Sequence, residues 1–409
     1  MSRCPFADLS DPDLHRGGVP AELYRELREV RVVRQETPMR GGEGFWAFFR
    51  QEDIDRISKN PAQFSSSLKT SFFNDVGEDQ LPLMRTMILN MDPPEHVKYR
   101  RIVRNAFTPS KVDSYEPRFR EVVRGAVDRI ATRGECEFVT DIACVLPLIA
   151  ICEILGVPVG DRTKFFDWTN TMLGADDPDL NLSEFDGQMA AAELYMYADN
   201  IMARHRDNPQ DDIVGALLRG SVGGEKLNED EFRSFMMLLI VAGNETTRTM
   251  TSQGMRLLME YPEQYQMMVD DPSLIPDAVE EILRFNPAVM NFRRTVTEPT
   301  EVGGQALATG DKVVMFYQAA SRDEAVFENP DCFDITRPRR EDVRNNHRAF
   351  GIGEHFCLGS HLARLQLNIV FEELTKRIRN PRLDGEIRWL RSNFIHGIKE
   401  MRMKFDLAG

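Results

Sequence analysis

Apolar residues recur at helical spacing over most of the chain, and the pattern is strongest in its middle third. This spacing predicts helices over residues 114–132, 146–155, 162–172, 184–206, 213–219 and 276–285. A further helix is expected to begin near Glu95, after the pair Pro93-Pro94. Another follows Cys357, where Leu358, Leu362, Leu365, Ile369 and Leu374 form one apolar face.

Strand signals are fewer than helix signals. Aromatic residues predict a strand pair around residues 45–49, and β-type sequence runs over residues 289–318, before an irregular stretch over 321–346. No Gly, Ser or Pro-rich linker divides the chain. We therefore expect one domain over residues 1–409, mainly α with a small β portion, in which residues 1–19 form an N-terminal arm.

The longest predicted helix begins after Asn228, whose side chain can cap it together with Glu231, three residues further on. Pro262 marks its end. About 33 residues at roughly 1.5 Å per residue give a length of about 50 Å, enough to cross the molecule. Residues 235–241 are apolar on every side, so we expect the centre of this helix to be buried.

Composition and charge narrow the class of protein. Apolar residues make up 42% and charged residues 28% of the 409, which is typical of globular proteins. The net charge of −14 disfavours a nucleic-acid partner. Residues 1–22 lack the apolar core of a signal peptide, and the apolar runs 144–152 and 235–243 are too short to span a bilayer. We expect a cytoplasmic protein without a membrane anchor.

One basic stripe stands out in this acidic chain. It consists of Lys98, Arg100, Arg101, Arg104 and Lys111. Such a patch can attract an acidic protein partner.

Six cysteines lie along the chain without CxxC spacing, which disfavours zinc and iron–sulfur sites. Cys144 and Cys152 lie in an apolar segment and are interpreted as small core residues. Only Cys357 has a special neighbourhood, the sequence FGIGEHFCLG at the entrance of a predicted helix.

The position of Cys357 favours a thiolate. Free amides and the dipole of the following helix are expected to lower the pKa of its thiol, while Gly351 and Gly353 allow a tight turn and a close approach of a flat ligand. Two alternatives remain on this pattern alone. One is a glycine-rich turn with a buried cysteine, and the other is a hydrolase nucleophile.

The loop, read as FxxGxxxCxG with His355 two residues before the cysteine, resembles the haem-binding signature of the cytochrome P-450 superfamily of haem-thiolate monooxygenases. The resemblance extends over residues 20–405 and is strongest to the soluble bacterial, ferredoxin-supported group. It implies a single-domain fold with a long central helix over heme b. It also implies that Cys357 is the axial iron ligand, that His355 contacts a propionate, and that Phe350 and Gly351 line the cofactor.

A buried haem also requires cations that neutralise its two propionates. His96 and Arg100 share one helix face at i, i+4 and resemble the family's HxxxR pair, and Arg294 resembles its propionate-binding arginine. Taken singly, each of these residues is more simply a solvated surface charge.

Glu281 and Arg284 lie at i, i+3 and resemble the family's ExxR element. ExxR alone is a common surface pattern. In the family it implies a buried ion-pair cluster with Arg337 as the third member, and the expected role is structural.

Within the long helix, Ala242-Gly243-Asn244-Glu245-Thr246 places polar groups in an apolar run. Thr246 can donate a hydrogen bond to the carbonyl of Ala242, which would open the helix locally. A small-residue helix crossing is the simpler alternative. The segment resembles the family's oxygen-binding groove, which implies that Thr246 holds dioxygen and Glu245 relays protons. The acid is Glu where many relatives have Asp, so its reach is longer.

The resemblance implies hydroxylation of an unactivated C–H bond of a steroid, terpenoid or hydrocarbon-like substrate with O2. No reductase-like segment follows the last helix, so ferredoxin with ferredoxin reductase is the expected electron source. The alternatives are a peroxide-using peroxygenase and a haem-binding sensor without turnover. If the family layout holds, the apolar residues near the haem are Phe72, Phe73, Leu81, Met87, Met236, Ala242, Gly243, Val289, Met290, Phe292 and Phe394.

Overall fold

The structure is a computed structural model that describes residues 8–408, except residues 37, 39–41, 175, 176, 181, 209, 211 and 223. The helices are α1 (Ala21–Val30), α2 (Gln51–Ser58), α3 (Leu81–Met84), α4 (Glu95–Val103), α5 (Pro109–Asp113), α6 (Glu116–Ala131), α7 (Val145–Leu155), α8 (Arg162–Leu173), α9 (Glu184–Asp207), α10 (Ile213–Arg219), α11 (Glu229–Glu260), α12 (Pro262–Asp270), α13 (Ile275–Phe285), α14 (Tyr317–Ala320), α15 (Val343–Asn346) and α16 (Ser360–Arg377). The strands are β1 (Val32–Gln35), β2 (Phe45–Phe48), β3 (Phe64–Ser65), β4 (Glu135–Glu137), β5 (Ser221–Val222), β6 (Glu225–Lys226), β7 (Asn291–Val296), β8 (Thr300–Val302), β9 (Gln305–Leu307), β10 (Lys312–Phe316), β11 (Ile378–Leu383), β12 (Arg388–Trp389), β13 (Ile398–Glu400) and β14 (Arg402–Leu407).

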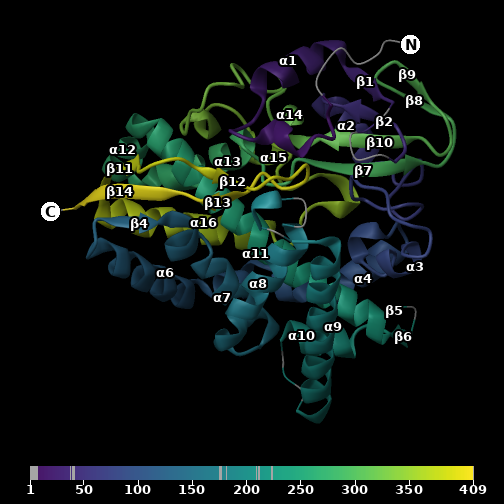
Figure 1. Ribbon diagram of the computed structural model, residues 1–409, viewed down its shortest axis with the longest axis horizontal. Helices are drawn as coiled ribbons and strands as arrows, with labels where there is room; N and C mark the ends of the chain where they lie inside the picture. The colour runs from purple at the N-terminus through teal and green to yellow at the C-terminus, as the bar shows by residue number, and fades with distance from the viewer. Residues whose placement is uncertain are drawn as a thin grey trace.

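The expected class, mainly α with a small β portion, is confirmed, and the helices predicted over 114–285 lie within a few residues of α6 to α11 and α13, whereas α12 was not predicted. Figure 1 shows a smaller β-rich part at the top, with α1 beside it, and a larger helical part that extends down to α9 and α10. No helix in the described ranges is both long enough and apolar enough to cross a membrane.

The β-rich part is built on a five-stranded sheet in the order β1-β2-β10-β7-β3. Strands β10 and β2 run parallel, and the other neighbours are antiparallel. Every residue of β10 is buried, because the side chains on its two faces pack into two separate apolar cores. Val314 packs with Tyr24 and Leu27 of α1 on one face, and Val313 packs with Ile57 of α2 on the other.

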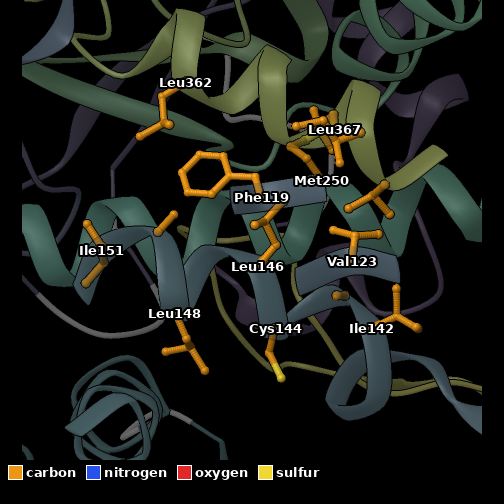
Figure 2. Packing of buried hydrophobic residues seen from close by; sticks show 14 of the residues in the cluster. Phe119, Val123, Ile142, Cys144, Leu146, Leu148, Ile151, Met250, Leu362 and Leu367 are labelled. Carbon is orange, nitrogen blue, oxygen red and sulfur yellow. The ribbon is translucent and has the colours of Figure 1, made fainter. Parts of the chain in front are cut away.

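The helical part has one large apolar core. Figure 2 shows how α6, α7, α11 and α16 contribute side chains to it, including Phe119, Leu146, Met250 and Leu367. The helices cross closely, since a Cβ added to Gly254 of α11 would lie 2.6 Å from the ring of Phe371. Packing of this density explains why the helices form where their apolar faces predict them.

Helix α11 has the predicted start. The side chain of Asn228 accepts a hydrogen bond from the Glu231 amide, and the Glu231 carboxylate accepts one from the Asn228 amide, so the capping box is complete. The helix ends at Glu260, before Pro262. The expectation of a buried centre over residues 235–241 holds for Phe235, Met236 and Ile240, whereas residues 237–239 and 241 keep some exposed surface. The next residue, Ala242, is exposed.

Two further differences concern strands. The predicted β segment ends at Phe316, and Tyr317–Ala320 forms α14, whose turn is closed by the Ser321 amide donating to the Tyr317 carbonyl. The sheet β11-β14-β4 was not predicted, since its strands carry many exposed charges around a few apolar residues. Tertiary pairing forms these strands rather than local pattern.

Candidate active site

The loop over residues 350–359 turns tightly before α16. Gly351 and Gly353 have φ values of +66° and +77°, a region that favours glycine. A Cβ at Gly353 would lie 2.5 Å from the Ser58 carbonyl oxygen, so no larger residue fits there. The Cys357 amide donates to the Phe350 carbonyl at 2.9 Å, and this bond closes the loop around the cysteine.

Cys357 lies two residues before Gly359, the N-cap of α16. Burial raises the pKa of the Cys357 thiol, whereas the Gly359 amide and the charges of Arg100 and Arg364 act to lower it. The predicted lowering of the thiol pKa is therefore wrong for the polypeptide alone. In the polypeptide alone, desolvation outweighs the helix terminus.

Four basic side chains converge beside this loop. They are His96 and Arg100 of α4, Arg294 of β7 and His355. The imidazole rings of His96 and His355 have centroids 4.1 Å apart, and His355 Nε2 is hydrogen-bonded to Ser66 Oγ at 3.2 Å. Arg100 donates to the Phe356 carbonyl, which ties the cluster to the residue before the cysteine.

The two arginines of this group are not paired with a carboxylate among the described residues. Within the described part of the chain, neither Arg100 nor Arg294 forms an ion pair, and Nδ1 of the buried His96 has no hydrogen-bond partner. Burial lowers the pKa of Arg294, and burial with the charges of Arg100 and Arg294 lowers the pKa of His96 to about 4. A partly buried group of basic side chains, in which two arginines form no ion pair and one imidazole nitrogen has no partner, fits a ligand that carries carboxylates.

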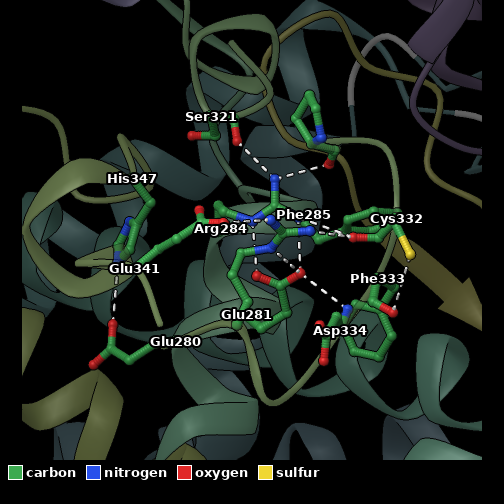
Figure 3. A network of polar contacts seen from close by, with 12 residues as sticks. Glu280, Glu281, Arg284, Phe285, Ser321, Cys332, Phe333, Asp334, Glu341 and His347 are labelled. Atoms are coloured by element: carbon green, nitrogen blue, oxygen red, sulfur yellow. Dashed lines mark hydrogen bonds and ion pairs between the residues drawn. The ribbon is translucent and has the colours of Figure 1, made fainter. Parts of the chain in front are cut away.

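A second buried cluster is complete in itself, and Figure 3 shows it. Glu281 forms a bidentate pair with Arg284, with distances of 2.7 and 2.8 Å, and accepts from Arg337 Nε at 3.2 Å. The arginines also donate to backbone carbonyls, among them that of Cys332. The structure thus brings together the three residues of the predicted cluster, and Glu341 adds a second carboxylate that lies 3.2 Å from Arg337.

The middle of α11 contains the predicted polar break. The Thr246 hydroxyl donates to the Ala242 carbonyl at 2.7 Å, as the sequence predicted. Ala242 is exposed and Thr246 partly exposed, and their spacing of four residues places both on one side of the helix. Gly243 points elsewhere, because a Cβ there would lie 2.6 Å from Ile151 of α7.

Glu245 is buried on another side of α11. Its carboxylate pairs with Arg248 and accepts from the Thr249 hydroxyl at 3.3 Å. Arg248 in turn donates to Asn170 at 2.8 Å. A small cavity of about 130 Å³ borders Glu245, Arg248 and Asn170, with Lys399 at its wall. Sequence analysis missed Arg248, although its i, i+3 spacing from Glu245 was readable.

The predicted pocket residues divide into two groups. Phe72, Phe292 and Phe394 are partly exposed and form edge-to-face ring contacts, with centroids 5.7 Å apart for Phe72–Phe394 and 5.4 Å for Phe292–Phe394. Val289 and Ala242 also keep exposed surface.

The other predicted pocket residues lie in the packed interior. Met236 and Met290 have no exposed surface, and Phe73 packs against Phe45 with centroids 5.0 Å apart. Leu81 and Met87 are almost fully enclosed. Phe73 and Met236 belong to the apolar cores, and the pocket-lining roles of Phe73, Met236, Met290 and Gly243 stay predictions.

The basic stripe lies beside the cysteine loop. Arg100, Arg101 and Arg104 line an open recess of about 530 Å³ together with Lys59, Val97, Gly353 and Glu354. Lys98 does not line it, and its ammonium lies 3.7 Å from Glu95. The recess carries four cations and one carboxylate at the surface nearest the loop.

Comparison with known proteins supports one family. The sequence model of the Cytochrome P450 family matches residues 48–379. The chain is 37% identical to a steroid C26-monooxygenase of Rhodococcus jostii, over 98% of this chain and 85% of that protein. It is 34% identical to a linalool 8-monooxygenase of Pseudomonas putida, over 97% and 98% of the two chains. A Mycobacterium marinum cytochrome P450 solved in complex with pseudoionone superimposes with a TM-score of 0.90 at 33% identity, over 99% of this chain and 100% of that one.

Proposed function

Since this chain belongs to the cytochrome P450 family, we propose that it is a haem-thiolate monooxygenase that hydroxylates an unactivated C–H bond of a hydrophobic substrate through a site built on Cys357. One observation carries the assignment of the site. The loop of Cys357 lies against Arg100, Arg294 and two histidines, and neither arginine forms an ion pair within the described part of the chain.

The residues fit heme b. Cys357 would bind the iron, Phe350 and Gly351 would line the ring, and the cations of Arg100 and Arg294 would neutralise the propionates together with His96 and His355. Haem with an axial thiolate supplies the activation of dioxygen and the transfer of one oxygen atom to carbon. The polypeptide supplies the position of the substrate, the exclusion of bulk water and the protons.

Glu245 and Thr246 would deliver those protons. The cavity of about 130 Å³ beside Glu245 has room for water, and Arg248, Asn170 and Lys399 at its wall are polar groups that water could bind, so protons would reach the carboxylate from that side. Arg248 holds the carboxylate away from Thr246. To pass a proton on, Glu245 has to rotate from Arg248 towards the exposed face of α11, where the Thr246 hydroxyl holds the acceptor in place.

The substrate would lie between the aromatic group of Phe72, Phe292 and Phe394 and the exposed face of Ala242. These side chains offer apolar surface and no charge, which suits a steroid, terpenoid or hydrocarbon-like molecule. The named activities of the two curated relatives, on a steroid and on linalool, support this class.

Electrons would come from a ferredoxin kept reduced by its reductase. The basic recess of Arg100, Arg101 and Arg104 lies beside the Cys357 loop and is complementary to an acidic partner. Lys98 does not line this recess, but we include it in the proposed docking surface for ferredoxin.

The carbon monoxide complex of the reduced protein tests the proposal. A thiolate ligand gives a strongly red-shifted absorption band that a histidine-ligated haem lacks, and Cys357→His should abolish it. Cys332→Ser, at an exposed cysteine, is the matched control and should keep the band. Product formation with a surrogate ferredoxin then separates a monooxygenase from a peroxygenase or a sensor. A histidine-like spectrum for the unmodified protein would overturn the proposal.

A further inference from the structure

Helix α13 carries two adjacent buried glutamates that serve different segments. Glu281 binds the arginines of the ion-pair cluster, whereas Glu280 binds His347 and Arg364. Arg364 donates to both oxygens of Glu280, at 2.6 and 2.9 Å, and His347 Nε2 lies 3.1 Å from Glu280 Oε2. Figure 3 shows Glu280 and His347 joined by this contact, apart from the Glu281 pair.

The protonation of His347 follows from its neighbours. The Ala349 amide donates to His347 Nδ1 at 3.2 Å, so Nδ1 accepts and the proton lies on Nε2, which donates to Glu280. Burial acts to raise the pKa of Glu280, but the hydrogen bonds from His347 and Arg364 outweigh it and lower the pKa to about 2. Glu280 is therefore a carboxylate with both partners in place.

The two partners of Glu280 flank the cysteine loop. His347 precedes Cys357 by ten residues and Arg364 follows it by seven, so one carboxylate holds the chain on both sides of the loop. The side chain of Arg364 also reaches into the loop. Its guanidinium lies 4.6 Å from the ring centroid of Phe350, whose carbonyl accepts from the Cys357 amide at 2.9 Å.

We propose that Glu280 is a positioning residue that fixes the direction of the Cys357 sulfur by fastening both ends of its loop to α13. The proposal rests on the proposed role of Cys357 as the iron ligand. Within this clamp, His347 fixes the entry of the loop at Ala349, and Arg364 fixes Phe350 by stacking. Glu281 stabilises a different segment, so the two neighbouring carboxylates have separable effects.

The test compares Glu280→Gln with Glu373→Gln in the haem-loaded protein. Glu373 is a buried carboxylate on the same helix as Arg364, but it binds Arg377 and Lys376 at the far end of α16. Each variant is reduced, bound to carbon monoxide and held in mild denaturant. The thiolate-type absorption band and the helical circular dichroism are then followed together.

In the unmodified protein and in Glu373→Gln, the band and the helix signal should disappear together. In Glu280→Gln the band should disappear about tenfold faster than the helix signal, in keeping with the loss of charged hydrogen bonds. If Glu280→Gln does not fold, Arg364→Lys answers the same question, because it keeps the charge and loses the bidentate pair and the stack. It should show a smaller separation of the same sign.

Coincident loss of the two signals in both Glu280→Gln and Arg364→Lys would overturn the clamp. That result leaves the proposed function intact, provided that the unmodified protein shows the thiolate-type band. Absence of the band from the unmodified protein would overturn the proposed function itself, so the two failures are distinguishable.

Discussion

The two clusters of charged side chains beside the cysteine loop and on α13 differ in whether their arginines are paired. Glu281 binds both Arg284 and Arg337, Glu341 also pairs with Arg337, and the arginines use their remaining donors on carbonyl groups. In the cluster of Arg100, Arg294 and the two histidines, neither arginine forms an ion pair among the described residues. A complete cluster holds the fold together, whereas an incomplete one needs a ligand to become stable. Removing a charge should therefore have opposite effects in the two places.

The largest effect is expected at the complete cluster. Glu281→Gln leaves Arg284 buried without its anion and Arg337 with Glu341 alone, and this should cost about 3–5 kcal/mol of unfolding free energy. Chemical unfolding of the purified protein measures it. Glu301→Gln, at an exposed strand position, should change stability by less than about 0.5 kcal/mol. A stable Glu281→Gln protein would show that the cluster is dispensable.

The incomplete cluster should behave in the opposite way. Arg294→Met removes a buried charge without a partner, so the haem-free protein should keep its stability or gain about 1 kcal/mol. Haem affinity should fall about 10- to 100-fold, because one charge-assisted contact to a propionate is lost. The rate of haem transfer to a scavenging globin measures the affinity. Destabilisation as large as that of Glu281→Gln would erase the distinction between the clusters.

The pH dependence of stability provides a further test of the cluster beside the cysteine loop. Burial lowers the pKa of His15 to about 3, and burial with Arg100 and Arg294 lowers that of His96 to about 4. The unfolded chain binds these protons near pH 6.5, so stability is lost as the pH falls below that value. His15 alone accounts for about 2 kcal/mol at pH 5.

Unfolding midpoints at pH 7, 6 and 5 measure this loss. His15→Gln should flatten the acid side of the curve equally with and without haem. Bound haem should reduce the loss of stability at low pH that His96 causes, because the propionates stabilise the protonated imidazole of His96. Equal acid sensitivity of the haem-free and the haem-loaded protein would contradict an anion beside His96.

Thr246 has a smaller effect on stability, because its hydroxyl satisfies only the Ala242 carbonyl. Thr246→Ala should cost about 0.5–1.5 kcal/mol. It should still bind haem and substrate and consume dioxygen, but much of the reducing power should appear as hydrogen peroxide, because proton delivery is misplaced. The ratio of hydroxylated product to electrons consumed measures this coupling. Full coupling would leave Thr246 as a packing residue.

The smallest effect on stability is expected at the surface. Changing Lys98, Arg101 and Arg104 to Glu should alter unfolding by less than about 0.5 kcal/mol per site. Reduction by ferredoxin should be slower, most strongly at low salt, while substrate affinity is unchanged. Stopped-flow reduction at several ionic strengths measures the rate. Rates that are independent of charge and salt would exclude this docking surface.

Sequence predicted the parts of this molecule that local spacing determines. The helices, the capping box of Asn228 and the back-bond of Thr246 all depend on residues within four positions of one another. The Cys357 loop and the ExxR pair were found through short motifs. The sheet β11-β14-β4 and the pairing of Glu280 with Arg364, 84 residues apart, depend on chain segments that meet only in the fold.

Burial was the other property that sequence could not supply. Met236 and Phe73 have the apolar character of pocket residues, yet the structure places them in the core. The thiol of Cys357 has the helix terminus that lowers a pKa, yet desolvation is the larger effect. In both cases the surrounding packing decides between two outcomes that the same residue type allows.

The pairing of β4 with β14 has a consequence for biosynthesis. Met401, next to β14, donates to Glu137 of β4 across 264 residues, so β4 emerges from the ribosome long before its partner. At ~5–20 residues per second, this edge stays unpaired for roughly 13–50 s of translation. The nascent chain therefore carries an open strand edge during most of its synthesis. Its yield in a cell should depend on how well chaperones shield that edge until the final strand arrives.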